Sequence, residues 1–464
     1  MESTSLPILL QEWPYVHVIN EDQAQLFCHY CFKGADEVAK LYRCSRCKFA
    51  QYCGKKCQTM AHKDHLNECK RLLELKGVIP SSKARLMARI IFKANEVYKP
   101  DERLPAELQK RQFQDLMNHG KEILEDENGK IKEFRHVCVE LNRYLGSEYC
   151  LTENVLLDIY GKLAINAFGI HLSSNNLDVG EGLYLGTSIL DHSCDPDAYV
   201  YFDGPNIIIR AVKSGVENKP LKEVKISYFD TFKSTQERRA LTTEAYYFSC
   251  DCSFCNDEKL NSEMRSVLCS HCSGVADLNA NDSTATCQQC QKVTDATSAV
   301  ALMKEIEHVF KLQEMSNRLS WTGKPMSPDA PNQVLTKLNA KIFELDLKAR
   351  SQLSPINVYA CRLAASLQDM TDAAGRMDLS IGYCERSLKG LMHFGHPLNP
   401  RRLLQMKNLG MVFSERLDRI EDGIRLLREA ERGYSLIDDQ RRAKQCRTLL
   451  ASALTLLIKS DGKK

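Results

Sequence analysis

The spacing of the cysteines is the feature that most limits how this chain can fold. The chain has 464 residues and 20 cysteines, and 14 of the cysteines lie in short Cys-rich spacings, with Cys194 in a separate motif. The first block follows the pattern Cx2C–x12–Cx2C–x5–Cx3C–x7–Hx3C. Zinc prefers four thiolate or imidazole ligands in a tetrahedron, and a CxxC turn brings two thiolates to one metal. The block therefore predicts two closed, structural zinc sites. Its eight ligands are Cys28, Cys31, Cys44, Cys47, Cys53, Cys57, His65 and Cys69.

Two later groups of cysteines also have zinc spacing. Cys250, Cys252 and Cys255 form a CxCxxC motif, which is specific for zinc chemistry. Two CxxC pairs, separated by 14 residues, predict a further zinc site of ribbon type, and the alternative is two unrelated surface pairs in a loop. These pairs are Cys269 with Cys272 and Cys287 with Cys290. The five isolated cysteines are expected to be buried or neutral thiols, and they are Cys138, Cys150, Cys361, Cys384 and Cys446.

The overall charge excludes some classes of partner. The chain has 63 Lys+Arg against 60 Asp+Glu, so no global charge calls for a nucleic acid or a membrane. Direct DNA binding is not expected, because the sequence offers no recognition helix. No apolar run is long enough to span a membrane, and the start lacks the basic region of a signal peptide. We therefore expect a soluble, intracellular protein whose cysteines bind zinc and do not form disulfides.

Hydrophobic patterning predicts a mixed chain with a helical end. Residues 5–20 are apolar and β-prone, and residues 70–145 read as helices, including LPAELQKRQFQDLMNHGKEIL. Residues 151–230 combine one helix, ENVLLDIYGKLAINAF, with the short strands AYVYF, NIIIRAV and VKISYF. From residue 299 onward amphipathic helices follow one another, with a weak echo of the tetratricopeptide pattern near Leu409. Such arrays usually provide binding surfaces.

Three segments carry a resemblance to a known family. Residues 182–202, GLYLGTSILDHSCDPDAYVYF, resemble the SET-domain segment usually written NHSCDPN, and ISYFD with AYYFSCDCSFC matches the end of that domain. The first cysteine block resembles the MYND finger. The chain thus resembles the SET and MYND domain-containing protein-lysine methyltransferases over nearly its whole length.

The resemblance implies an α+β fold in several parts. They are remnant SET strands (1–27), a MYND finger (28–69), a helical insertion (70–150), the SET core (151–230), a post-SET zinc region with the extra ribbon (231–298) and an all-helical, tetratricopeptide-like domain (299–464). By the resemblance Cys28, Cys31, Cys53 and Cys57 share one zinc, and Cys44, Cys47, His65 and Cys69 share another. Cys194 joins Cys250, Cys252 and Cys255, so about four zincs are expected. His29 and His62 lie outside the pattern and are expected at the surface.

The resemblance also assigns a reaction, in which a methyl group passes from S-adenosylmethionine to a lysine amine. Tyr228 and Tyr246 match catalytic tunnel tyrosines, and Tyr228 lies beside the transferred methyl group. Cofactor contacts are implied for His119, Asn166, Ser188, Asp191, His192, Tyr228 and Phe248. The alternatives are a packed strand aromatic for Tyr228 and an exposed helix histidine for His119.

Two departures from the family pattern affect these expectations. No Gly-x-Gly cofactor turn precedes the first cysteine block, which predicts a truncated SET start and weak cofactor binding. Asp191 stands where asparagine is usual, and its charge is tolerable facing an ammonium and costly facing a carboxylate or a carbonyl. The expected function is a lysine methyltransferase acting on histone or other proteins, in cytoplasm and nucleus. The alternative is a weak or inactive adaptor that binds protein partners through its finger and helical domain.

Overall fold

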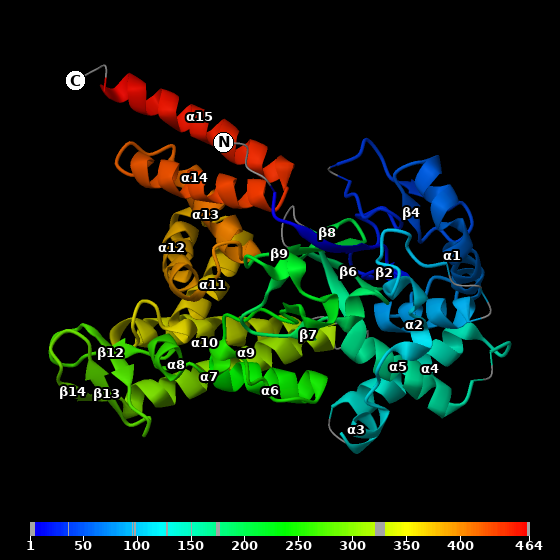
Figure 1. The fold of residues 1–464 in the computed structure, drawn as a ribbon, viewed down its shortest axis with the longest axis horizontal. Helices are drawn as coiled ribbons and strands as arrows, with labels where there is room; N and C mark the ends of the chain where they lie inside the picture. The colour runs from blue at the N-terminus through cyan, green and yellow to red at the C-terminus, as the bar shows by residue number, and fades with distance from the viewer. Residues whose placement is uncertain are drawn as a thin grey trace. The chain divides into compact units, whose positions relative to one another are not determined.

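The computed structural model divides the chain into two compact units. It describes residues 5–35, 37–94, 96, 99–126, 129–149, 151–172, 177–320 and 330–461. The core unit comprises Pro7–Ser227 and Ala240–Ser249. The helical unit comprises Met1–Leu6, Tyr228–Arg239 and Cys250–Lys464. Figure 1 labels elements of both units where there is room.

Two antiparallel three-stranded sheets form the β-structure of the core unit. One has the order β1-β9-β8 and the other β2-β6-β5, so both expected N-terminal strands exist and each pairs with a strand from the second half of the unit. The short strands β7 and β10 pair in parallel, and β3 pairs with β4 in the finger. The strands are β1 (Ile8–Glu12), β2 (Val16–Ile19), β3 (Tyr42–Arg43), β4 (Gln51–Tyr52), β5 (Ala167–Leu172), β6 (Leu177–Leu183), β7 (Asp191–His192), β8 (Ala198–Asp203), β9 (Asn206–Ala211) and β10 (Lys225–Ile226).

Helices cover the second of these sheets. Apolar residues of β2, β5, β6, α2, α4 and α5 share one buried cluster. Ser81 caps α2 by accepting from the Ala84 N–H at 3.3 Å, and Gly146 ends α4 with a left-handed φ of 74°. The helices of this unit are α1 (Lys55–Glu74), α2 (Ser82–Lys93), α3 (Gly120–Glu125), α4 (Lys130–Leu145), α5 (Glu153–Asn166) and the end of α6 (Thr235–Tyr246).

Two expectations for this unit were wrong. The segment from residue 104 to 124 is no continuous helix, because it forms only two 3₁₀ turns before α3. Its buried residues Leu104, Leu108 and Leu116 anchor a segment that follows the surface of the core. The predicted strand VKISYF shortens to β10, which ends at Ile226.

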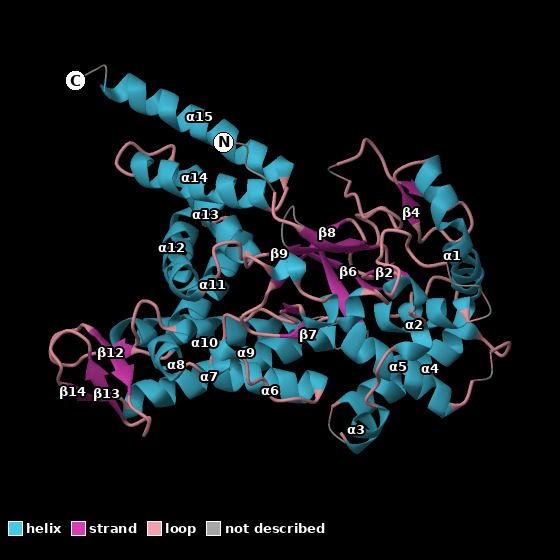
Figure 2. Cartoon of the chain, in the orientation of Figure 1, coloured by secondary structure: helices cyan, strands magenta, loops and turns pink. Residues whose placement is uncertain are grey.

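The helical unit combines a small sheet with a series of packed helices, as Figure 2 shows. The sheet is antiparallel, in the order β11-β12-β13-β14, and it carries the predicted ribbon cysteines. Its strands are β11 (Val267–Leu268), β12 (Val275–Leu278), β13 (Thr284–Cys287) and β14 (Val293–Asp295). The helices are α7 (Ser253–Asn256), α8 (Glu258–Met264), α9 (Thr297–Ser320), α10 (Ala330–Gln352), α11 (Val358–Ala373), α12 (Met377–Phe394), α13 (Pro400–Phe413), α14 (Ile420–Leu436) and α15 (Gln440–Asp461).

Close helix packing explains the glycines near the tetratricopeptide-like segment. Consecutive helices pack in pairs, α11 on α12 and α13 on α14. A Cβ at Gly410 would lie 2.7 Å from Leu427, and one at Gly423 would lie 2.6 Å from the Ser414 nitrogen. Only glycine allows α13 and α14 to approach this closely. Among the described residues, no helix combines the length and apolar character needed to cross a membrane.

Candidate functional site

Four groups of cysteine and histidine side chains have the geometry of zinc sites. In each group the ligand atoms lie within 4.8 Å of one another. The groups are Cys28, Cys31, Cys53 and Cys57; Cys44, Cys47, His65 and Cys69; Cys194, Cys250, Cys252 and Cys255; and Cys269, Cys272, Cys287 and Cys290. The composition of all four groups agrees with the sequence prediction.

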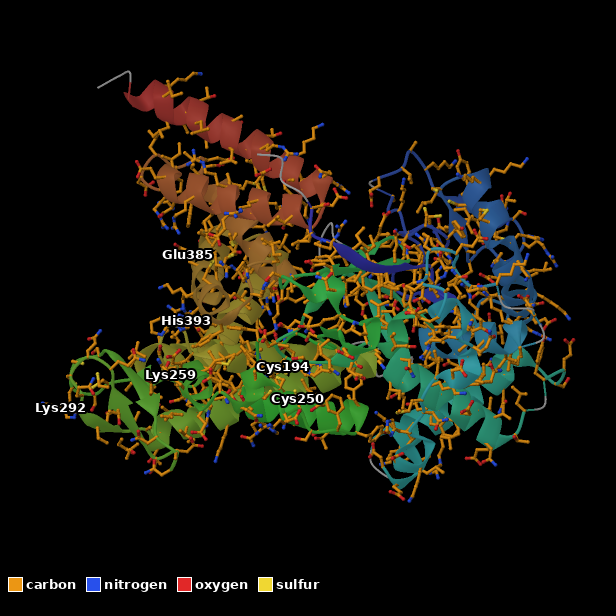
Figure 3. All side chains as sticks on the ribbon, in the orientation of Figure 1. Cys194, Cys250, Lys259, Lys292, Glu385 and His393 are labelled. Atoms are coloured by element: carbon orange, nitrogen blue, oxygen red, sulfur yellow. The ribbon has the colours of Figure 1, made fainter. Side chains whose placement is uncertain are left out.

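Sulfur-to-sulfur distances distinguish these groups from disulfides. The Sγ atoms of Cys44 and Cys69 lie 3.8 Å apart, those of Cys31 and Cys53 3.7 Å, and those of Cys269 and Cys290 3.7 Å. A tetrahedral zinc with Zn–S bonds of about 2.3 Å places two sulfurs about 3.8 Å apart. The cysteines are free thiols in the described part of the chain. The donor sets therefore fit structural zinc, with four protein ligands and no open position. Figure 3 labels Lys292, which lies in the turn between the ribbon strands β13 and β14.

A buried ionic network connects the finger to the strands of the core unit. The Nε2 atom of His65 lies 3.6 Å from Cys47 Sγ, and its Nδ1 atom lies 3.5 Å from Glu68 Oε2. Glu68 is 1% exposed and accepts from Arg89 at 2.8 Å. Arg89 also donates to the His17 carbonyl, and Arg85 donates to the Ile19 carbonyl. One carboxylate thus links a zinc ligand on α1 to α2 and, through the arginines, to β2.

The expectation that His29 lies at the surface was wrong. His29 is buried, its Nε2 lies 2.9 Å from the Ala24 carbonyl oxygen, and its ring packs on Phe49. Burial lowers the pKa of His29 to about 3, so the ring is neutral and structural. His62 is exposed, as expected.

The isolated thiols match their prediction wherever the structure describes them. Cys361, Cys384 and Cys446 are buried and Cys138 is half-buried. Burial raises the pKa of Cys384 to about 12 and the pKa of the other three to about 11. These thiols are neutral at physiological pH. Cys150 lies outside the described residues.

Backbone hydrogen bonds join β7 and the residue that follows it to β10. Asp191 pairs with Lys225 and His192 with Ile226 in the parallel ladder, and the Ser193 N–H donates to the Ile226 carbonyl at 2.9 Å. The Asp191 carboxylate lies 2.9 Å from the Lys225 ammonium. Aspartate at position 191, where the family usually has asparagine, is therefore tolerated, because its added negative charge faces the Lys225 ammonium.

Asn166 and the segment of His119 are joined by hydrogen bonds. The amide of Asn166, the last residue of α5, donates to the Met117 carbonyl at 2.9 Å and to the Lys162 carbonyl at 2.8 Å. His119 precedes α3, and its ring centroid lies 4.6 Å from that of Tyr247. The alternative of an exposed helix histidine is wrong for His119, because the side chain is half-buried against Tyr247.

A second group of predicted cofactor residues surrounds β7. The His192 and Phe248 rings lie 6.0 Å apart, and His192 Nε2 lies 3.2 Å from Cys194 Sγ. Phe248 keeps 36% of its surface exposed. Ser188 donates to the Leu185 carbonyl at 2.8 Å and accepts from Arg111 at 3.3 Å.

The two predicted catalytic tyrosines lie on different local structures. Tyr246 is the last residue of α6, and burial raises its pKa. Tyr228 belongs to the helical unit, where it is half-buried in a bend. The packed strand position considered for Tyr228 is wrong, because β10 ends two residues earlier. The catalytic roles of both residues stay predictions.

Sequence reasoning missed Glu12, which holds the segment before Ser188. The Glu12 side chain is fully buried, and its carboxylate accepts from the Gly186 N–H at 2.9 Å, the Thr187 N–H at 2.7 Å and the Thr187 hydroxyl at 2.8 Å. A Cβ on Gly186 would lie 3.1 Å from Glu12 Oε2, so glycine permits this approach. The available signal was a single acidic residue inside the apolar stretch of residues 5–20.

A carboxyl group on β6 gives a testable pH dependence. Burial, together with the charges of Glu181 and Asp22, raises the pKa of Asp178 to about 7. The folded pKa lies above the unfolded value, so the free energy of unfolding should fall as pH rises from about 4 to about 7. Asp178→Asn should therefore be more stable than the parent at pH 8, by about 2–4 kcal/mol, with a smaller difference at pH 4. Urea unfolding at both pH values measures this.

The matched control for this experiment is an exposed aspartate. Asp203→Asn, at the end of β8, should change the free energy of unfolding by less than about 0.5 kcal/mol at either pH. A parent protein whose stability is flat between pH 4 and pH 8 would contradict the raised pKa of Asp178.

This chain is similar to known proteins over much of its length. The MYND finger family model matches residues 28–69. Histone-lysine N-methyltransferase SMYD3 of Homo sapiens is 25% identical over 446 residues, which cover 93% of this chain and 90% of that protein. Histone-lysine N-methyltransferase Smyd1 of Mus musculus is 30% identical over 264 residues, 53% of this chain and 51% of that protein. Histone-lysine N-methyltransferase ASHR1 of Arabidopsis thaliana is 27% identical over 357 residues, 74% of this chain and 69% of that protein.

Proposed function

We propose that this chain, a relative of the SET- and MYND-domain methyltransferases, is an S-adenosylmethionine-dependent protein-lysine N-methyltransferase. Similarity to such enzymes over 93% of the chain carries the proposal. The proposed substrates are lysines of histones or other proteins. The finger and the helical domain are proposed to bind protein partners, and cytoplasm and nucleus are the proposed locations.

The chemistry of the predicted cofactor residues fits the proposed cofactor. S-adenosylmethionine offers a methyl group on a sulfonium, an adenine ring and a charged methionine end. Phe248 and His192 present rings 6.0 Å apart, suited to contact with a flat base or a cation. The Asn166 carboxamide and Ser188 hydroxyl can hydrogen-bond polar groups. These four residues would hold the cofactor.

The chain's own residues would align the amine and exclude water. A lysine amine must lose its proton before it can attack, and desolvation beside a cation lowers its pKa. Tyr228 would orient the amine through its hydroxyl, and Tyr246 would line the lysine channel. Catalysis then comes mainly from positioning and from oriented dipoles. The zinc groups have no open coordination position and take no part in the transfer.

The test is removal of a single hydroxyl. Tyr228→Phe should lower kcat by about 100-fold while cofactor affinity changes little, because the interaction acts mainly in the transition state. Methyl transfer from labelled cofactor to histone and non-histone lysines measures turnover, and calorimetry measures cofactor affinity. Tyr42→Phe is the matched control, because Tyr42 is 56% exposed in the finger.

Two outcomes would contradict the proposal. An unchanged rate for Tyr228→Phe would mean that this tyrosine only packs. A folded parent protein that neither binds the cofactor nor methylates any protein lysine would favour the adaptor function instead.

A further inference from the structure

The segment that follows Tyr228 is anchored to the helices of the helical unit. Residues 228–239 belong to that unit, together with α9 to α15. Phe232 is 5% exposed, and a Cβ at Gly390 of α12 would lie 2.6 Å from its ring. Glycine on α12 thus leaves the space that Phe232 fills, and this contact fixes the segment four residues after Tyr228.

An ion pair holds the same segment two residues after Tyr228. Oδ2 of Asp230 lies 3.2 Å from the guanidinium of Arg401, which is in the first turn of α13. The other carboxylate oxygen of Asp230 accepts from the Phe232 N–H at 3.0 Å. Both charged side chains are partly exposed, so either one can be replaced without leaving an unpaired charge in the core.

A capping box at the start of α6 is held by α11. The N–H and the hydroxyl of Ser234 both donate to Glu237 Oε2 at 2.9 Å, and the Glu237 N–H donates to Ser234 Oγ at 3.2 Å. The second carboxylate oxygen of Glu237 accepts from Arg362 of α11 at 2.6 Å. The Arg362 guanidinium also lies over the Phe310 ring of α9, 4.3 Å from its centroid. Both members of the Arg362–Glu237 pair are almost buried, so this contact firmly orients the start of α6.

Tyr228 therefore lies in a short connection whose later part is bound to three helices. The strand β10 ends at Ile226, two residues before Tyr228, and the pair formed by Asp230 follows two residues after it. A shift of the backbone at Asp230 is transmitted to Tyr228, because only Phe229 separates them in the chain. A misplacement of about 1 Å in a reacting group can lower turnover by about 100-fold.

We propose that Arg401 and Arg362 are positioning residues for methyl transfer. Arg401 acts through its ion pair with Asp230, and Arg362 acts through Glu237 and the capping box. Together they hold the backbone on which Tyr228 lies, so the tyrosine hydroxyl keeps one orientation toward the amine. This inference rests on the proposed methyltransferase function. The helical unit then contributes to the reaction itself, in addition to the partner binding proposed for it.

The first test removes one anchor at its partly exposed pair. Arg401→Gln should lower kcat by about tenfold while cofactor affinity measured by calorimetry changes little, because the substitution disturbs orientation and not cofactor binding. Arg401→Lys keeps the cation beside Asp230 and should restore most of the rate. Arg376→Gln is the matched control, because Arg376 forms an exposed pair with Asp378 at 2.8 Å and should leave kcat unchanged.

The second test removes the charge at the capping box and keeps the box. Glu237→Gln retains a side-chain oxygen that can accept from Ser234, since glutamine serves in capping boxes as glutamate does. Its neutral amide no longer forms the ion pair with Arg362. We expect kcat to fall by about tenfold, again with little change in cofactor affinity.

Two readouts separate positioning from a general structural role. In the Tyr228→Phe background the hydroxyl to be oriented is absent, so Arg401→Gln should lower kcat further by less than about twofold. Hydrogen exchange, followed by mass spectrometry on peptides that span residues 228–234, should become about tenfold faster in Arg401→Gln. The Arg376→Gln control should leave this exchange unchanged.

The outcomes distinguish this inference from the function on which it rests. In an active parent, an unchanged kcat for Arg401→Gln, or an equal loss with and without the Tyr228 hydroxyl, would overturn the inference and leave the enzyme standing. If the parent transfers no methyl group, the missing transfer counts against the proposed enzyme, and hydrogen exchange decides the anchoring. Faster exchange in Arg401→Gln then supports the anchoring of the segment, and unchanged exchange refutes it.

Discussion

Cys44→Ala is expected to remove one zinc and to destabilise much more than the finger. Cys44 belongs to the group of Cys47, His65 and Cys69. Loss of a thiolate leaves three ligands, and zinc binding contributes directly to folding in such modules. His65 then loses its fixed orientation, and Glu68 loses one of its partners.

The size of this effect follows from the buried network. Glu68 and Arg85 are almost completely buried, and Arg89 is 6% exposed. Disrupting one partner in such a buried ionic set typically costs about 3–5 kcal/mol. We expect the free energy of unfolding of the core unit to fall by at least that amount. Elemental analysis should show three zincs per chain in place of four, and guanidinium unfolding measures the stability.

Two cysteine variants serve as controls for the zinc prediction. Cys138→Ala changes a half-buried cysteine that joins none of the metal groups found among the described residues, so all four zincs should remain. Cys272→Ala should remove the ribbon zinc. A Cys44→Ala protein with full zinc content would show that the finger ligands are wrongly assigned.

The zinc ligands of the finger and the ribbon could be predicted because their spacing is local, whereas the interleaved grouping of the finger ligands was implied by the resemblance to the MYND finger. A CxxC spacing determines which thiolates can meet one metal, and the turn geometry does not depend on the rest of the chain. The strands β1 and β2 were likewise predictable from their apolar, β-prone composition. The strands with which they pair lie about 160–200 residues away in the sequence, and no local pattern identifies them.

Long-range partners explain what the sequence could not show. His29 lies between two zinc ligands, and its burial depends on Ala24 and Phe49, which pack around it. The segment from residue 104 to 124 has helical periodicity, but its apolar side chains serve as separate anchors to the core. From the sequence alone, Arg85 and Arg89 would be assigned to the exposed polar face of α2. In the structure both are buried, and Glu68 and two backbone carbonyls of β2 compensate their charges.

The candidate site also contains residues that a motif identifies and residues that no motif identifies. Asp191 and His192 belong to a recognisable motif, so their position was predictable from the residues around them. Glu12 and Arg111 belong to no motif, and they act through contacts made only when separate elements pack.

Glu12→Ala is expected to have the second large effect, on both stability and cofactor affinity. The substitution leaves the Gly186 N–H, the Thr187 N–H and the Thr187 hydroxyl without their acceptor. A buried donor without a partner costs about 1–3 kcal/mol, so the free energy of unfolding should fall by about 3–5 kcal/mol. Because Ser188 follows directly, we expect cofactor affinity to fall about tenfold as the segment moves.

Glu12→Gln separates the charge of this residue from its hydrogen bonds. Burial raises the pKa of Glu12, although its hydrogen bonds to Gly186 and Thr187 oppose the shift. The folded pKa therefore exceeds the unfolded value, and the contribution of Glu12 to stability should decrease as pH rises through that pKa. Glutamine keeps one acceptor oxygen and does not titrate, so the variant should lose less stability than Glu12→Ala and should lack this pH dependence. Chemical unfolding from pH 4 to pH 8, with Glu217→Ala as the exposed control, measures both effects. If Glu12→Ala unfolds within about 0.5 kcal/mol of the parent and binds the cofactor equally well, the segment before Ser188 does not depend on Glu12.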